Sequence, residues 1–233
     1  MANKDDQIKI PKQVGPYRVL KLLGSGSMAS VFLAEQAGRG GFRKKLALKI
    51  VRPEYADDEM FIKLLMREAA IGGLLRHPNI IQTLSFEQYD GRYVLVLEYV
   101  SGRTVRQVLR RDRQPKGGLN ASLAIDICVQ VCRALDYAHA LEDDEQTKLE
   151  IIHRDLKPQN IMTGGFGEVL VLDWGLAVLA EPGEDVTAPA AGTPSYMAPE
   201  MVNPPFLVGP RSDVYLLGAI LFRFLTGKAP HAG

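Results

Sequence analysis

The sequence predicts an α+β protein of two lobes, in which a small β-rich lobe with a single helix precedes a larger, mainly helical lobe. Two observations predict this division. Before residue 100, short apolar runs between glycine turns predict strands, and one amphipathic pattern at residues 57–76 predicts a helix. After residue 100, the long patterns are helical, at residues 122–142 and from Ser212 onward. We therefore expect a flexible tail, a small lobe and a large lobe at residues 1–16, 17–100 and 101–233.

The composition is that of an ordinary globular protein. Its 28 lysines and arginines nearly balance 27 aspartates and glutamates, so no strong field attracts nucleic acid or an anionic membrane. The start lacks the apolar core of a signal peptide, and the longest apolar run, residues 214–225, is too short to span a bilayer. Cys128 and Cys132 are four residues apart in a helical pattern, which suits reduced cysteines in a protein interior. We expect a cytoplasmic domain without a membrane span and without nucleic acid as a partner.

A glycine-rich turn interrupts the first strands. Residues 17–23 and 31–34 have strand patterns, and Gly24, Ser25 and Gly26 lie between them. A hairpin with a glycine tip can lay backbone N–H groups over a phosphate, because the missing Cβ atoms permit close approach. A plain turn would show the same pattern, so both interpretations stay open. A Rossmann dinucleotide site would need a helix after the glycines, whereas this sequence continues as a strand.

The next strand and the helix after it carry opposite charges among apolar residues. Lys49 lies in the strand at residues 46–51, with apolar neighbours on both sides. Glu68 lies on the apolar face of the helix, which is formed by Phe61, Leu64, Leu65, Gly72 and Leu75. A carboxylate on an inward face calls for a cation, and Lys49 is the best candidate. An exposed-edge lysine and a solvated glutamate remain the alternatives.

Residues 80–86 and 92–97 predict two further strands, and helices are predicted at residues 104–111 and 122–142. The predicted core face of the longer helix consists of Ile125, Val129, Cys132, Leu135, Tyr137 and Ala138. His139 at its end is predicted to be structural or solvated. The acidic stretch at residues 141–150 predicts a solvated surface insertion.

Residues 151–175 hold the strongest chemical signal. Asp155, Asn160 and Asp173 flank a predicted hairpin, made by residues 160–162 and 168–172, that turns through glycines. Buried carboxylates are unfavourable unless a cation meets them, and such oxygen ligands suit Mg²⁺ together with substrate phosphates. The segment therefore indicates phosphoryl transfer.

These residues match the motifs of a known family. His153-Arg154-Asp155 with Asn160, followed by Asp173-Trp174-Gly175, resembles the catalytic loop and metal-binding motif of the eukaryotic-type protein kinases. Ala198-Pro199-Glu200 resembles the A-P-E motif, which small-molecule kinases generally lack. In style the chain is similar to the bacterial eukaryotic-like Ser/Thr kinases. The resemblance implies a two-lobed protein kinase fold that uses ATP and Mg²⁺ (or Mn²⁺), phosphorylates protein Ser/Thr hydroxyls, and can dimerise.

The resemblance also implies a role for each matching residue. The catalytic set is Asp155, which would orient the substrate hydroxyl, together with Lys157, Lys49 and Glu68. Asn160 and Asp173 would hold the metal ions. The implied nucleotide contacts are Leu23, Gly24, Ser25, Gly26, Val31, Ala47, Lys49, Leu97, Glu98, Val100, Thr104, Asn160 and Asp173. Lys157 and Thr193 together resemble Ser/Thr kinases more than tyrosine kinases.

Three more residues bear on regulation and support of the site. In this family, an arginine in the position of Arg154 marks an activation segment that is ordered by a phosphate paired with it. Thr187, in an acidic stretch, is the expected autophosphorylation site. Asp213 is implied to anchor the backbone of the catalytic loop, with simple complementarity to its own helix N-terminus as the alternative.

Two features depart from the family pattern. Trp174 replaces the usual phenylalanine, and Gly72 stands where a larger side chain usually packs against that aromatic, so we expect the two to compensate in volume. Kinase domains also continue through further helices, one of which brings an arginine to the A-P-E glutamate. The chain therefore resembles a C-terminally truncated kinase domain whose Glu200 lacks its partner. An ATP-binding pseudokinase or signalling scaffold is the alternative function, and a small-molecule phosphotransferase is the third.

Overall fold

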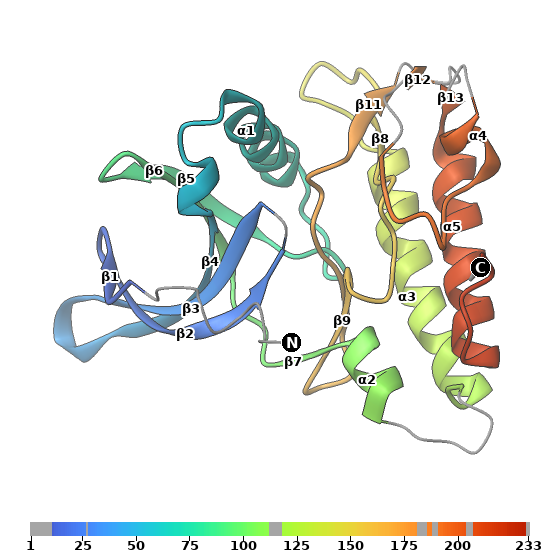
Figure 1. Ribbon diagram of the computed structural model, residues 1–233, viewed down its shortest axis with the longest axis horizontal. Helices are drawn as coiled ribbons and strands as arrows, with labels where there is room; N and C mark the ends of the chain where they lie inside the picture. Colours follow the sequence, from blue (N-terminus) through green and yellow to red (C-terminus); the bar gives the residue numbers. More distant parts are fainter. Residues whose placement is uncertain are drawn as a thin grey trace. The chain divides into compact units, whose positions relative to one another are not determined.

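The computed structural model describes residues 11–26, 28–111, 118–180, 186–187, 191–203 and 207–231 (Figure 1). The chain forms two compact units. Unit 1 consists of Met1–Leu74 and Gln82–Val100, and unit 2 of Leu75–Ile81 and Ser101–Gly233. The short segment Leu75–Ile81 belongs to unit 2 because Ile80 bridges Val171 and the Asn79 side chain donates to the Val169 carbonyl.

Unit 1 is built on one antiparallel sheet with the strand order β1-β2-β3-β4-β6-β5. Its strands are β1 (Gln13–Val14), β2 (Tyr17–Ser25), β3 (Ala29–Ala37), β4 (Arg43–Val51), β5 (Thr83–Tyr89) and β6 (Arg92–Glu98). Alternate residues of these strands form a buried cluster that includes Phe32, Leu48 and Val96. The expected tail at residues 1–16 is wrong at its end, since Gln13 and Val14 pair with β2 and Val14 is buried. Residues 1–10 lie outside the described residues.

Helix α1 (Glu59–Leu74) packs on this sheet and is the helix predicted from the 3.6-residue pattern (Figure 1). It begins after Asp58, whose carboxylate accepts a hydrogen bond from the Met60 N–H and so satisfies an end donor. Its buried residues are Leu65, Glu68, Ile71 and Gly72. A Cβ on Gly72 would lie 2.2 Å from the Thr83 hydroxyl oxygen of β5, so only glycine allows this close approach.

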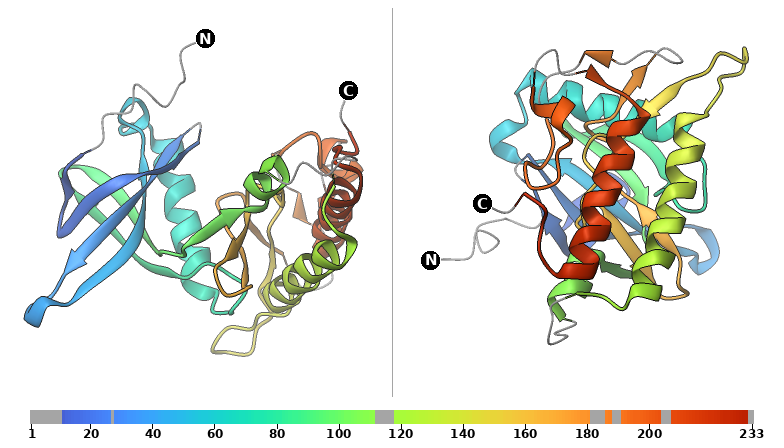
Figure 2. Two further views of the ribbon diagram at one scale, coloured as in Figure 1. Left: turned by 90° about the horizontal axis from the view of Figure 1, so that it is seen from below. Right: turned by 90° about the vertical axis from the view of Figure 1, so that its right-hand side faces the viewer.

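Unit 2 combines helices with small sheets of two or three strands (Figure 2). Its helices are α2 (Val105–Arg111), α3 (Ala121–His139), α4 (Pro199–Val202) and α5 (Pro210–Thr226). Its strands are β7 (Gly102–Thr104), β8 (Glu150–Ile152), β9 (Ile161–Gly164), β10 (Val169–Val171), β11 (Val178–Ala180), β12 (Val186–Thr187) and β13 (Leu207–Val208). They pair in the orders β10-β9-β7, β11-β8 and β12-β13. The hairpin predicted around residues 160–172 is confirmed as β9 and β10.

Helix α3 is capped by Asn120, whose side chain accepts from the Ser122 N–H, and it packs against α5. The predicted core face was only partly right. Leu135 and Ala138 are buried, but Ile125 is 54% exposed and Val129 and Cys132 are also exposed. The actual buried stripe contains three alanines and runs through Ala124, Ile127, Cys128, Val131, Ala134, Leu135 and Ala138. Apolar residues form two stripes on this helix. The stripe with the smaller side chains is the buried one, because it allows neighbouring elements to pack more closely.

The first turn of helix α5 contains the buried residues Ser212 and Asp213, which belong to the candidate site. Gly209 and Pro210 open this helix, and Gly227 ends it with a left-handed φ of 73° that glycine adopts without strain. Helix α5 is apolar on nearly every side, which predicts that it is buried all round, and the structure contradicts this prediction. Val214, Phe222 and Leu225 are exposed, because α3 and β8 cover one side only among the described residues. Within the described part of the chain, no helix has the length and apolar character needed to cross a membrane.

Candidate active site

In unit 1, the predicted partnership of Lys49 and Glu68 is present. The Lys49 ammonium on β4 lies 2.7 Å from both carboxylate oxygens of Glu68 on α1. Both side chains are largely buried, with 16% and 9% exposed respectively. The two alternatives, an exposed lysine and a solvated glutamate, are therefore excluded. A buried charge pair of this geometry holds the ammonium at a defined point above the central strand of the sheet.

The strands of unit 1 bring several predicted nucleotide contacts together. Val31 on β3 is the register partner of Lys49, and Ala47 on β4 is the register partner of Leu97 on β6. The backbone N–H of Glu98 donates to the Gln82 carbonyl, and the Glu98 carboxylate accepts from the Gln82 N–H. Neighbouring strand residues on one face of a sheet form a continuous lining, which suits a flat ligand.

The glycine-rich turn between β2 and β3 is held by backbone contacts. The Gly26 N–H donates to the Ala29 carbonyl, and the Arg52 N–H donates to the Met28 carbonyl. A Cβ at Gly24 would meet no atom within 4 Å, and one at Gly26 would meet only an ordinary contact. Packing inside unit 1 therefore does not require either glycine. The open space would accommodate a bound phosphate, and it fits a plain exposed turn equally well.

In unit 2, Thr104 has a local structural role. Its hydroxyl accepts from the Gln107 N–H at 3.3 Å, while the Gln107 side chain accepts from the Thr104 N–H at 3.0 Å. This reciprocal pair starts α2. The sequence predicted Thr104 as a nucleotide contact and gave no sign of this cap.

The carboxylate of Asp155 is the meeting point of the catalytic loop. It is 6% exposed and is contacted by the Lys157 ammonium and by the Thr193 hydroxyl, which donates to Oδ1 at 3.0 Å. The Asn160 amide nitrogen donates to the Asp155 carbonyl at 2.9 Å and to Oδ2 at 3.1 Å. Three residues, up to 38 positions from Asp155 in the sequence, thus converge on its carboxylate. They fix its orientation beside the Lys157 cation.

Asn160 and Asp173 are joined through their backbone. The Leu172 N–H donates to the Asn160 carbonyl at 2.8 Å, which places the residue before Asp173 against Asn160. Asp173 itself has a φ of 62°, a left-handed conformation that is unusual outside glycine and clusters at functional sites. Among the described residues, no group of three or more His, Cys, Asp or Glu side chains could hold a metal. An amide and a carboxylate could hold a hard divalent cation only together with phosphate oxygens.

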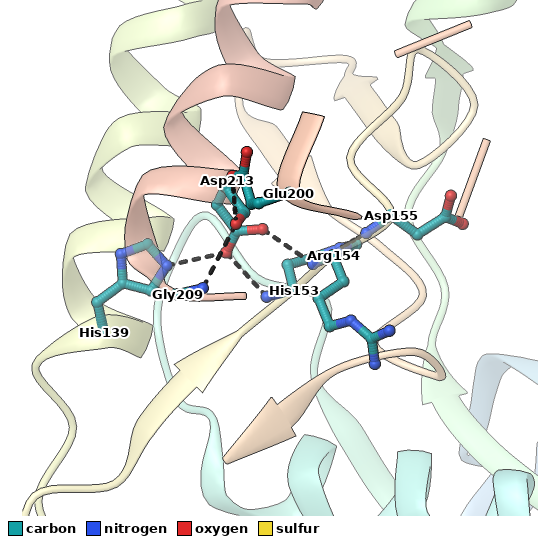
Figure 3. A network of polar contacts seen from close by, with 8 residues as sticks. His139, His153, Arg154, Asp155, Glu200, Gly209 and Asp213 are labelled. Atoms are coloured by element: carbon teal, nitrogen blue, oxygen red, sulfur yellow. Dashed lines mark hydrogen bonds and ion pairs between the residues drawn. The ribbon is translucent and has the colours of Figure 1, made fainter. Parts of the chain in front are cut away.

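Asp213 ties the catalytic loop to α5 (Figure 3). Its carboxylate is fully buried and accepts from the backbone N–H groups of His153 and Arg154, at 2.8 and 2.9 Å. Arg154 has a φ of 68°, so the loop is held in a conformation that needs such support. The anchoring role that the resemblance implied for Asp213 is present in this geometry, beyond simple complementarity to the helix N-terminus.

His139 is a member of this network that sequence reasoning did not identify. Its Nε2 lies 2.9 Å from Oδ2 of Asp213, as Figure 3 shows. The imidazole therefore lies between the end of α3 and the start of α5. The sequence shows only a polar residue at the end of a helix whose buried face is otherwise apolar. This signal does not identify Asp213 as the partner of His139.

Glu200 has a hydrogen-bond partner that differs from the arginine of the family pattern. The Ser212 hydroxyl donates to Glu200 Oε1 at 2.7 Å, and the Gly209 N–H donates to the Ser212 oxygen (Figure 3). The first turn of α5 thus holds the catalytic loop through Asp213 and the Ala198-Pro199-Glu200 segment through Ser212. Thr187 lies in β12, where its register partner is Leu207 of β13, and its side chain is outside the described set.

The expected volume exchange between Trp174 and Gly72 is not needed to explain either residue. Trp174 is 2% exposed and its ring lies 4.6 Å from that of His153. Gly72 is required by Thr83 within its own unit. Among the described residues, the Trp174 indole nitrogen has no hydrogen-bond partner, which is unusual for a buried donor.

Comparisons with known proteins agree with this geometry. Residues 17–233 match the family model described as protein kinase domain. The chain is 34% identical to the serine/threonine-protein kinase PrkC of Bacillus subtilis over 94% of its own length and 32% of that protein. It is 37% identical to the serine/threonine-protein kinase pkn3 of Myxococcus xanthus, over 92% of the chain and 38% of that protein. It is also 30% identical to the tyrosine-protein kinase MasK of Myxococcus xanthus, over 93% and 33%. The chain spans about a third of the length of these relatives.

Proposed function

The chain belongs to the protein kinase family, and we propose that it transfers the γ-phosphate of ATP to Ser and Thr hydroxyls of proteins, using a divalent cation. One observation carries the proposal. The Lys157 ammonium, the Thr193 hydroxyl and the Asn160 amide all converge on the carboxylate of Asp155. Such an arrangement orients an acid-base group and places a positive charge beside it, which phosphoryl transfer requires.

In the proposed reaction, Asp155 accepts the proton of the substrate hydroxyl as its oxygen attacks the γ-phosphorus. The bond to the bridging oxygen of ADP breaks, and ADP leaves. Lys157 stabilises the charge on the transferring phosphoryl group, while Thr193 holds Asp155 in position. Asn160 and Asp173 would hold Mg²⁺, which would supply neutralisation of the phosphate charge. Mn²⁺ offers the same oxygen chemistry and could replace it.

Unit 1 would supply the nucleotide-binding groups. Lys49, fixed by Glu68, would pair with the α and β phosphates. The open glycine turn at Leu23, Gly24, Ser25 and Gly26 would offer backbone N–H groups to phosphate. The adjacent strand residues Val31, Ala47 and Leu97 would line the base, whose polar edge would meet the backbone of Glu98 and Val100. Although Thr104 already caps α2, its hydroxyl would keep its proton and one lone pair for contact with the nucleotide.

We also propose that Thr187 is phosphorylated by the kinase itself. Its strand β12 pairs with β13, which leads directly into the first turn of α5. A phosphate near Arg154 would be paired with a guanidinium, as charge-assisted hydrogen bonds are strong. The proposed compartment is the cytoplasm, where ATP is supplied.

The test is transfer of labelled phosphate from ATP to a protein acceptor, followed by phosphoamino acid analysis. We expect label on serine and threonine, and loss by about 10² to 10³ in the Asp155→Asn variant, as for removal of one preorganised group. Asp126→Asn, a matched change at an exposed position of α3, should keep the activity. Label on tyrosine alone would instead support a tyrosine specificity for this chain, as in the name of its relative, the tyrosine-protein kinase MasK. ATP binding without transfer would support the pseudokinase alternative.

A further inference from the structure

The segment around α2 concentrates positive charge that the proposed reaction does not use. Residues 103–116 contain six of the 28 basic residues of the chain and one of its 27 acidic residues, although the whole chain has a net charge of only +1. Four of these side chains lie in the described part, and all four are exposed. They are Arg103, Arg106, Arg110 and Arg111, and we call them the arginine face. Among the described residues, the structure contains no salt bridge from any of them.

Helix stability explains only half of this face. Arg110 and Arg111 lie in the last turn of α2, where positive charge favours the C-terminal end of the helix dipole. Arg106 lies in the first turn, where a positive charge is unfavourable, and it is four residues from Arg110, a spacing at which like charges repel. Arg103 precedes the helix on β7. Helix stability therefore does not account for the charges of Arg103 and Arg106, whose exposed side chains are available to an external anion.

The arginine face lies beside both segments that hold Asp155. The Arg106 N–H donates to the Pro158 carbonyl at 2.8 Å, and Pro158 directly follows Lys157. Arg103 is the register partner of Thr163 on β9, the strand that begins directly after Asn160, and Figure 1 shows α2 next to this strand. Burial raises the pKa of Tyr196, and the charges of Arg223 and Arg106 oppose that shift. The charge of Arg106 thus acts on Tyr196, three residues after Thr193.

We propose that the arginine face binds acidic residues of the protein substrate next to the phosphorylated hydroxyl, so that the kinase selects acidic acceptor segments. This inference rests on the proposed kinase function. The chain itself contains an acceptor segment of the required chemistry. Glu181, Glu184 and Asp185 precede Thr187, whereas residues 188–192 carry no charge. The acidic residues of one copy would meet the arginine face of a second copy, which places Thr187 at Asp155 and makes autophosphorylation intermolecular.

The test compares two acceptor peptides with the full chain as enzyme. The first has the sequence of residues 179–192, in which Thr187 is the only hydroxyl residue. The second carries Glu181→Gln, Glu184→Gln and Asp185→Asn. Exposed ion pairs are individually weak, so we expect about a tenfold higher kcat/KM for the acidic peptide, mainly through a lower KM. The ratio should fall as salt concentration rises, because screening weakens exposed charge pairs.

Variants assign the preference to the arginine face. Arg106→Glu with Arg110→Glu should reverse the ratio of the two kcat/KM values, and Arg106→Lys with Arg110→Lys should retain the acidic preference. Arg133→Glu, which reverses an exposed arginine on α3 of the same unit, should leave the ratio unchanged. A preference that survives the double reversal would overturn the inference.

A third acceptor, myelin basic protein, separates the two levels of the proposal. Phosphorylation of this basic protein together with equal kcat/KM values for the two peptides would overturn the acidic selectivity and leave the kinase function standing. No transfer to any of the three acceptors would overturn both. Binding of a DNA duplex that the double reversal abolishes, with equal peptide rates, would instead assign the face to nucleic acid.

Discussion

The two units each bury a carboxylate, and they stabilise it in opposite ways. In unit 1, Glu68 meets the ammonium of Lys49 at 2.7 Å. In unit 2, Asp213 meets two backbone N–H groups and the imidazole of His139. One contact is an ion pair between two side chains on rigid elements. The other fixes the backbone conformation of a loop in which Arg154 has a positive φ.

This difference predicts that Lys49 and Glu68 contribute mainly to activity, whereas Asp213 contributes to both activity and stability. The side chains of the ion pair can be replaced without disturbing the backbone of β4 or α1. Removal of Asp213 releases backbone donors that are buried, and it also frees the loop that carries Asp155. Substitutions in unit 1 should therefore reduce activity more than stability, whereas substitutions around Asp213 should reduce both. Four variants test this contrast, from the largest expected change in stability to the smallest.

Asp213→Ala should have the largest effect on stability. It leaves the N–H groups of His153 and Arg154 unpaired in a buried site, which costs about 2–5 kcal/mol in the free energy of unfolding. Urea denaturation followed by circular dichroism measures this change, with the exposed Asp126→Ala of α3 as the matched control. Equal stability of the two variants would show that the loop does not depend on Asp213.

Lys49→Met should reduce activity by about 10² to 10³ while lowering stability by about 1–3 kcal/mol, because the buried Glu68 carboxylate loses the Lys49 ammonium. The double variant Lys49→Met with Glu68→Leu removes the Glu68 carboxylate as well. It should regain the stability and not the activity, since a buried pair can be replaced by apolar residues without loss. Recovery of both would contradict the assigned role of Lys49.

Ser212→Ala removes the hydroxyl that donates to Glu200 and should lower the free energy of unfolding by about 1–2 kcal/mol. Ser212→Thr keeps the donor and should be close to the parent. If the Ser212 bond positions the substrate-side segment, Ser212→Ala should raise the KM for the acceptor peptide and leave the KM for ATP unchanged. Equal changes in both KM values would indicate a structural role only.

Trp174→Phe should have the smallest effect, within about 1 kcal/mol of the parent in thermal unfolding. The indole nitrogen lacks a partner among the described residues, so its removal gains free energy that offsets the lost contact with His153. Trp174→Ala, which empties the site, is the contrasting variant and should destabilise strongly. A large loss in Trp174→Phe would indicate that the indole nitrogen has a partner after all.

The sequence predicted the parts of the site that depend on short-range spacing. Asp155, Asn160 and Asp173 flank a hairpin whose glycines and apolar strands are visible in the sequence, so their grouping could be predicted. Lys49 and Glu68 could be paired because a buried charge needs an opposite one. In both cases, one local pattern and one energetic rule were sufficient.

The remaining features depend on contacts between distant elements. The sequence did not indicate which side of α3 is buried, because two stripes of this helix are apolar. In the structure the alanine-rich stripe is buried, and α3 packs against α5. Ser212 and His139 looked ordinary, since their partners Glu200 and Asp213 become neighbours only in the folded unit. The short strand β1 was missed for the same reason, because its two residues are stabilised by pairing with β2.

The most direct test of the kinase assignment is intact-mass analysis of the protein after incubation with Mg-ATP, with Asp155→Asn and Asp126→Asn measured beside it. We predict that the parent and Asp126→Asn gain phosphate, that Asp155→Asn gains none, and that peptide mapping locates a phosphate on Thr187. Equal phosphorylation of Asp155→Asn, or no phosphate on a parent protein that binds ATP, would contradict the account of Asp155 as the group that accepts the proton of the substrate hydroxyl.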